Sequence, residues 1–214
     1  MTNLLRTVFA SLLIAAVPSA ASAADEPPHT VVSEEGSIQI RDYEAMIVAE
    51  VEVSGDMARA GNAGFRPLAG YIFGGNQARD GGSAEIAMTS PVTQTRSQEI
   101  AMTTPVTQSR TDDDSWRVAF VMPPEWTLDT LPTPDDPGVS LREQPARRMA
   151  IIRFNGGSAD ARFASKEMEL REYLTSQGME TRGEAVYARY DPPWIPTPFR
   201  RNEVMVELVL PEAS

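Results

Sequence analysis

One order of hydrophobic periodicities occurs twice along this chain, and it limits the folds that the chain can adopt. In each half, two segments of alternating apolar and polar residues precede one segment with apolar residues at helical spacing, and further alternating segments follow. Alternation indicates strands with one buried face, whereas helical spacing indicates an amphipathic helix. The expected strands are 37–43, 45–53, a doubled segment at 85–112, 116–122, 139–144, 148–154, 184–190 and 202–210, and the expected helices are 56–73 and 160–177. Helices set between antiparallel strand pairs predict an α+β fold with the helices packed on a curved sheet.

The segment 85–112 consists of two copies of one sequence, EIAMTSPVTQTRSQ followed directly by EIAMTTPVTQSRTD. In an extended chain, one face of each copy carries an Ile, a Met and a Val: Ile86, Met88 and Val92 in the first copy, and Ile100, Met102 and Val106 in the second. We expect both faces to contact the core. That requires an odd-length loop or a bulge between the copies, because a two-residue turn would point the faces in opposite directions. The duplication either extends a hairpin and does nothing else, or lines a pocket directly.

The two expected helices have distinct buried and solvated faces. The residues expected to face the core are Ala58, Phe65, Leu68, Ala69 and Ile72 in the first helix, and Phe163, Leu170 and Leu174 in the second. Arg59, Asn62 and Arg66 fall on the solvated face of the first helix. Gly178 is expected to end the second helix.

The first 23 residues have the features of an export signal. Arg6 precedes an apolar run from Val8 to Val17, and Ala21-Ser22-Ala23 fits a small-residue cleavage site. We expect cleavage before Ala24. An uncleaved anchor is the alternative, although the run is too short to span a bilayer. The chain then divides into a signal peptide (1–23), a flexible lead-in (24–30) and one domain (31–211), with a periplasmic or secreted location and no stable membrane insertion after cleavage.

Composition argues against several classes of function. A net charge of −11 disfavours binding to nucleic acid and to anionic lipid. With no cysteine and one histidine, His29 in the lead-in, the chain lacks a thiol nucleophile, the histidine of a serine triad and the ligands of a zinc site. It contains neither GxSxG nor a GxGxxG after a strand. We therefore expect a binding protein rather than an enzyme, and no metal site.

The residues suited to binding are arginines and soft apolar side chains. Arg59 and Arg66 could clamp a carboxylate, or they form an ordinary solvated helix face. Met88 and Met102 either fill the core or contact a ligand. Trp194 lies in a proline-rich loop at 191–198. This loop is expected to be stiff, with Trp194 as an apolar plug over one end of the sheet, and surface exposure of Trp194 is the alternative.

Several motifs together resemble the SOUL haem-binding protein family from about Val31 to Leu210. They are FRPLAGYIFGGN (65–76), the two IAMTxPV segments, FVMP (120–123), YDPPW (190–194) and FRRNEV (199–204). The resemblance implies a pseudo-twofold α+β fold, a distorted antiparallel β-barrel flanked by two helices, like the ligand-binding domains of multidrug-sensing regulators. It also implies haem or tetrapyrrole binding in an apolar cleft beside the first helix. The expected cofactor-binding residues are Arg59, Arg66, Tyr71, Met88, Met102 and Trp194.

The chain departs from the family at the positions that hold haem in animal members. His29 lies ahead of the matched motifs and does not correspond to the histidine proposed there as an iron ligand. The positions of basic residues become Asn62, Gly70 and Ile195. The resemblance therefore implies haem without axial ligation by histidine. Two hypotheses follow: an exported, non-catalytic tetrapyrrole carrier or scavenger, or an enzyme-like or sensor domain that uses the same cleft for another small apolar ligand.

Overall fold

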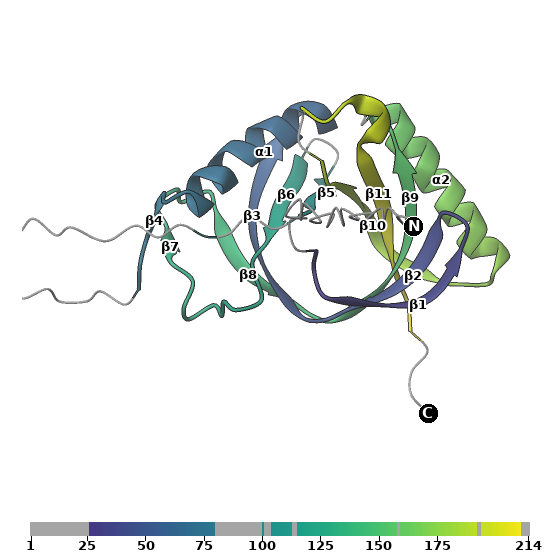
Figure 1. Cartoon of the computed structure of the whole chain (residues 1–214), viewed down its shortest axis with the longest axis horizontal. Helices are drawn as coiled ribbons and strands as arrows, with labels where there is room; N and C mark the ends of the chain where they lie inside the picture. Colours follow the sequence, from purple (N-terminus) through teal and green to yellow (C-terminus); the bar gives the residue numbers. More distant parts are fainter. Residues whose placement is uncertain are drawn as a thin grey trace, which may run out of the picture.

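The computed structural model describes residues 26–79, 100, 104–112, 115–157, 159–191 and 194–210. Its strands are β1 (His29–Glu35), β2 (Ile38–Tyr43), β3 (Met46–Ser54), β4 (Asn76–Gln77), β5 (Val106–Asp112), β6 (Ser115–Val121), β7 (Thr133–Pro134), β8 (Ser140–Gln144), β9 (Arg147–Asn155), β10 (Thr181–Arg189) and β11 (Arg201–Leu208). Its helices are α1 (Met57–Ile72), α2 (Asp160–Ser176) and the short 3-10 helix η1 (Thr197–Phe199). The α+β class is confirmed, and both long helices lie on the outer side of a curved antiparallel sheet (Figure 1).

The order of strands in the large sheet is symmetric about its centre. The order is β1-β2-β9-β11-β10-β5-β6-β3-β8, and β4 pairs with β7 in a separate two-stranded sheet. From the central β10–β5 pair outward, one side runs β11, β9, β2 and the other runs β6, β3, β8. The segments β3-α1-β5-β6 and β9-α2-β10-β11 thus occupy equivalent places. The strand that flanks each of these units on its outer side, β2 beside β9 and β8 beside β3, is contributed by the other half of the chain, and β1 adds one more strand beyond β2.

The predicted barrel is not closed. Strands β2 and β3 run against β9 and β8 in one continuous register, with Tyr43 opposite Arg147 and Met46 opposite Gln144. This long ribbon passes from one side of the sheet to the other and gives it its strong curvature. The two edge strands, β1 and β8, do not pair with each other. The free side of β2 is occupied by β1 instead, and a closed barrel does not form.

Strand β1 was not predicted from the sequence, and its first two residues, His29 and Thr30, fall within the lead-in that was expected to be flexible over 24–30. The His29 ring lies 5.2 Å from the Tyr43 ring, and its Nδ1 lies 2.9 Å from the carbonyl oxygen of Pro27. Most side chains of β1 are exposed, so its sequence shows little alternation. The strand is held mainly by its backbone pairing with β2.

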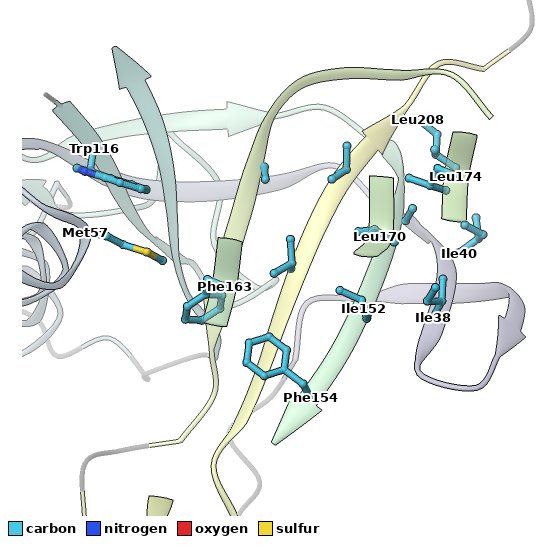
Figure 2. Packing of buried hydrophobic residues seen from close by; sticks show 14 of the residues in the cluster. Ile38, Ile40, Met57, Trp116, Ile152, Phe154, Phe163, Leu170, Leu174 and Leu208 are labelled. Carbon is cyan, nitrogen blue, oxygen red and sulfur yellow. The ribbon is translucent and has the colours of Figure 1, made fainter. Parts of the chain in front are cut away.

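One apolar cluster lies beneath α2. Phe163, Leu170 and Leu174 are the buried residues of this helix, as predicted, and α2 ends at Ser176, before Gly178 with its positive φ of 67°. The three buried side chains of α2 pack on residues of β9 and β11 such as Ile152 (Figure 2). The cluster continues past Phe163 to Met57 at the start of α1 and to Trp116 on β6, which Figure 2 shows at its other end.

A second apolar cluster lies beneath α1, and here the predicted helix face is only partly right. Leu68 and Ile72 are buried as expected. Ala58 is exposed, however, and Phe65 remains 41% exposed. The helix instead turns Gly64 toward β6, where an added Cβ would lie 2.6 Å from the Val118 Cβ. A helix can approach a strand this closely only where it carries no side chain, so Gly64 sets the rotation of α1.

Only the second copy of the repeated segment lies partly within the described residues. Ile100 is buried in the α1 cluster, and its N–H donates to the carbonyl of Ile72 at 2.8 Å. Val106, the first residue of β5, is half-buried against the same cluster. These two residues contact the core as predicted. Ile86, Met88, Val92 and Met102 lie outside the described residues.

Candidate functional site

A groove of about 530 Å³ lies on the outer side of the sheet, between the first turns of the two helices. Helix α1 packs mainly on β3 and β6, and α2 packs on β9 and β11, so the first turns of the helices flank the central β10–β5 pair. The groove is lined by Gly55, Asp56, Met57, Arg110, Trp116, Asp160, Ala161, Ala164 and Tyr187. Its volume is in the range of small-molecule sites. We define these residues as the interhelical groove.

Two aromatic rings form the floor of the groove. Trp116 is 5% exposed, and its indole N–H donates to the carbonyl of Gly55 at 3.0 Å. This bond ties β6 to the residue just before α1. The ring centroid of Tyr187 on β10 lies 6.0 Å from that of Trp116, and Phe163 packs edge-on against Tyr187 at 5.3 Å. The floor is therefore continuous with the apolar cluster beneath α2.

One cation lies over this floor. The guanidinium carbon of Arg110, on β5, is 5.1 Å from the centroid of the Trp116 ring, within the range of a cation–π interaction. Arg110 is exposed and forms no ion pair with a carboxylate among the described residues. A planar ligand that stacks on the floor could place a carboxylate on this guanidinium.

The phenol of Tyr187 is held in its neutral form. Burial raises its pKa, and the neighbouring Glu167 carboxylate raises it further. The hydroxyl donates to Glu167 Oε2 at 2.5 Å. Because a tyrosine ligates ferric iron as its phenolate, this environment disfavours iron coordination by Tyr187.

A buried polar pair holds the two sides of the groove together from below. Gln108 of β5 is fully buried, and its side-chain amide donates to the carbonyl of Met57 at 3.0 Å. Its amide oxygen accepts from Arg189 of β10, whose guanidinium carbon lies 4.9 Å from the centroid of Phe163. Burial lowers the pKa of Arg189. The pair links the first turn of α1 to α2 through the two central strands.

Two carboxylates border the groove, one at the start of each helix. Asp56 caps α1 by accepting from the Arg59 backbone N–H at 2.8 Å, and it forms an ion pair with the Arg59 side chain at 3.2 Å. Asp160 is the first residue of α2. Both side chains are acidic, and at this end of the groove they would repel the carboxylates of an anionic ligand. We therefore expect ligand carboxylates to lie toward Arg110 rather than between the helix starts.

Of the predicted binding residues that the structure describes, none lines the interhelical groove. Arg59 and Arg66 both lie on the exposed face of α1, and the Arg59 side chain is 85% exposed. Tyr71 is buried at the opposite end of α1 from the groove, about 20 Å along the helix axis. Its hydroxyl donates to the carbonyl of Pro132 at 2.9 Å, so it is a satisfied core residue. Met88 and Met102 lie outside the described residues.

The prediction that Trp194 plugs one end of the sheet is wrong. Its side chain is 79% exposed. The loop closes on itself, because the Arg200 Nε donates to the carbonyl of Ile195 at 2.8 Å and the Phe199 N–H donates to the carbonyl of Pro196 at 2.9 Å. Phe199 is 72% exposed as well, and no described residue of this loop lines the interhelical groove.

Arg110, Trp116 and Tyr187 were not among the site residues predicted from the sequence. Trp116 and Tyr187 belong to separate predicted strands, and no local pattern joins them. Their proximity arises from the pairing of β10 with β5 and of β5 with β6, which local periodicity does not reveal.

The described part of the chain contains neither a metal-binding cluster of side chains nor a membrane-spanning helix. No group of three or more His, Cys, Asp or Glu side chains there is arranged to hold a metal ion. Neither long helix of that part is apolar and long enough to cross a membrane.

The fold and the groove together define a class: an α+β protein with two helices outside a curved antiparallel sheet and a small-molecule-sized groove between them. Solved structures share this fold. The EcmrR C-terminal domain matches with a TM-score of 0.57 at 9% identity, and the match covers 80% of this chain and 96% of the EcmrR domain. A hydrolase from Listeria innocua matches with a TM-score of 0.50 at 10% identity, and the match covers 83% of this chain and 94% of the hydrolase chain. At such identities, the likeness shows the fold alone.

The family follows from the sequence match. The family model described as SOUL heme-binding protein matches residues 24–207. The chain therefore belongs to the SOUL family, which confirms the resemblance of its motifs. A search of curated proteins found no match.

Proposed function

We propose that the protein is exported and carries a tetrapyrrole, haem or a related ring, in the interhelical groove without altering it chemically. The observation that carries this proposal is the aromatic floor of Trp116 and Tyr187 with Arg110 above it. A tetrapyrrole is a large flat ring with carboxylate arms, and these residues offer both a stacking surface and a cation. Membership of a family described as heme-binding supports the same ligand class.

The geometry supports binding that depends little on iron. Among the groove residues, Met57 is 4% exposed and contributes to the core, and the Tyr187 hydroxyl is committed to Glu167. We therefore expect stacking and the Arg110 contact to supply most of the affinity. Iron-free protoporphyrin should then bind within about tenfold of haemin, which corresponds to roughly 1.4 kcal/mol.

Titration of the purified protein with haemin and with protoporphyrin tests this proposal. The Soret band reports binding, and quenching of tryptophan fluorescence reports contact with the groove floor. Arg110→Gln should weaken both ligands about fivefold, the value of an exposed ion pair of about 1 kcal/mol. Arg66→Gln is the matched control, because Arg66 is an exposed arginine of α1 that does not line the groove.

Each outcome separates one part of the proposal from the rest. Weaker binding in Arg66→Gln with no change in Arg110→Gln would place the ligand on the solvated face of α1. Haemin affinity far above that of protoporphyrin would reveal a protein–iron bond. If neither compound binds, the tetrapyrrole proposal fails, and the groove serves another ligand. Recovery of haemin unchanged after prolonged incubation is expected for a carrier, and conversion to a new product would contradict that role.

A further inference from the structure

A second pocket, of about 340 Å³, lies at the ends of β9 and β11 beside the β1–β2 turn. It is lined by Gly36, Ser37, Arg153, Phe154, Asn155 and Arg201. Two guanidinium groups thus line it, and none of its lining residues is acidic. This is unusual in a chain whose net charge is −11.

The two arginines converge because of the strand register. Arg201 is opposite Asn155, and Glu203 is opposite Arg153, so Arg153 and Arg201 are diagonal neighbours on one face of the sheet. Long side chains at diagonal positions on neighbouring strands are within reach of each other. The Arg201 guanidinium carbon lies 3.6 Å from the centroid of the Tyr190 ring, which restricts its orientation.

The buried carboxylate beneath the pocket is already compensated. Glu203 is fully buried and accepts two hydrogen bonds from Arg41, at 3.0 and 3.1 Å. It also accepts one from the Tyr190 hydroxyl at 2.5 Å. Arg153 Nε lies 3.5 Å from the same carboxylate. Glu203 therefore balances the charge of Arg41 and leaves Arg153 only weakly compensated.

Arg201 takes its carboxylate partner from the N-terminal segment. Its Nη2 lies 2.5 Å from Glu26 Oε1, and the two side chains are 28% and 34% exposed. The segment is docked there, because Pro27 is buried and the carbonyl of Pro28 accepts from the Glu44 N–H at 3.4 Å. The Asp191 carboxylate also borders this region and accepts from the Arg201 backbone N–H at 2.5 Å, so Arg153 is the pocket cation with the weakest compensation.

We propose that this pocket binds the carboxylate of a small organic anion, and that Glu26 is its internal competitor. The fork of Arg201 suits a carboxylate, as its contact with Glu26 illustrates, and Arg153 supplies a second cation to a ligand with two acidic groups. The site is separate from the interhelical groove and shares no lining residue with it.

Calorimetric titration of the purified protein with succinate tests the proposal, with the uncharged succinamide as the matched ligand control. Glu26→Gln keeps the size of the side chain and removes the competing charge. It should tighten succinate binding about threefold to tenfold. Arg201→Gln should abolish binding, and Arg153→Gln should weaken it. Arg182→Gln removes an exposed β10 arginine paired with Glu207, and binding should be unchanged.

The proposal is overturned if Glu26→Gln binds succinate no better than the parent protein, or if succinamide binds equally well. Absence of succinate binding in both proteins would overturn it too. If Arg201→Gln fails to fold, as judged by circular dichroism, Arg153→Gln decides, because Arg153 is 41% exposed. Arg110→Gln should leave succinate binding unaltered, so the result does not depend on the tetrapyrrole proposal.

Discussion

Replacement of Gly64 by alanine should destabilise the protein, although the same change within a helix is ordinarily favourable. A Gly→Ala substitution in a helix interior gains about 0.5–1 kcal/mol. At Gly64 the new Cβ would lie 2.6 Å from both Cβ and Cγ2 of Val118, about 1 Å inside the optimal carbon–carbon separation. Such overpacking costs about 1–3 kcal/mol. The net change at Gly64 should therefore lie between about zero and a loss of 2.5 kcal/mol.

Gly70 provides the matched control within the same helix. A Cβ there would meet nothing within 4 Å, so Gly70→Ala should gain the full helix-propensity term. Urea unfolding followed by circular dichroism should then place Gly64→Ala about 1–3 kcal/mol below Gly70→Ala. Equal stabilisation by both substitutions would refute the close packing of α1 on β6 and the rotation of α1 that follows from it.

Three further predictions concern titration and processing. Hydrogen bonds from Arg148 hold the pKa of Asp42 below its ordinary value. The pair therefore adds to the free energy of unfolding above about pH 4, and this stabilisation is lost as pH falls through the lowered pKa. Asp42→Asn should be less stable than the parent by under about 1 kcal/mol at pH 7, and urea unfolding should show this gap closing in acid, whereas a constant gap would contradict the linkage. Burial raises the pKa of Tyr71 to about 12. The neutral phenol therefore adds its full amount to the free energy of unfolding below about pH 10, and this stabilisation is lost as pH rises toward 12. Tyrosinate absorbance in Tyr71→Phe should lack a component that the parent releases only in that range, and an unchanged titration curve would argue against a buried phenol. Export should remove residues 1–23, and N-terminal sequencing that returned Met1 rather than Ala24 would reject the signal peptide.

The elements that the sequence predicted well are those whose stability comes from a local apolar pattern. Phe163, Leu170 and Leu174 recur at helical spacing, and all three are buried beneath α2. Strand β1 lacked such a pattern, since its side chains are mostly exposed and its stability comes from pairing with β2. In α1, the apolar pattern suggested a face that includes Phe65. The close contact at Gly64 rotated the helix instead, and only the facing strand shows why.

The candidate site could not be predicted from local sequence patterns, because its residues come from separate strands. Arg110, Trp116 and Tyr187 come from three strands, and their meeting depends on which strands pair at the centre of the sheet. The predicted residues Arg59 and Arg66 share a helix face, which periodicity revealed correctly, but that face is exposed to solvent. The resemblance to a family indicated a cleft beside the first helix. It did not indicate that the first turn of α2 would form the opposite wall.

The exchange of outer strands makes the two halves mutually dependent. Strand β2 precedes α1 in the chain but pairs with β9, and β8 precedes α2 but pairs with β3. A polypeptide cut in the connection between β6 and β8 would leave each fragment with an unpaired strand edge that only the other fragment completes. Such fragments should reassemble by complementation rather than fold singly. By the same geometry, two copies of one half would complete their sheets as a strand-exchanged dimer, which is the simplest single-half ancestor that this topology allows.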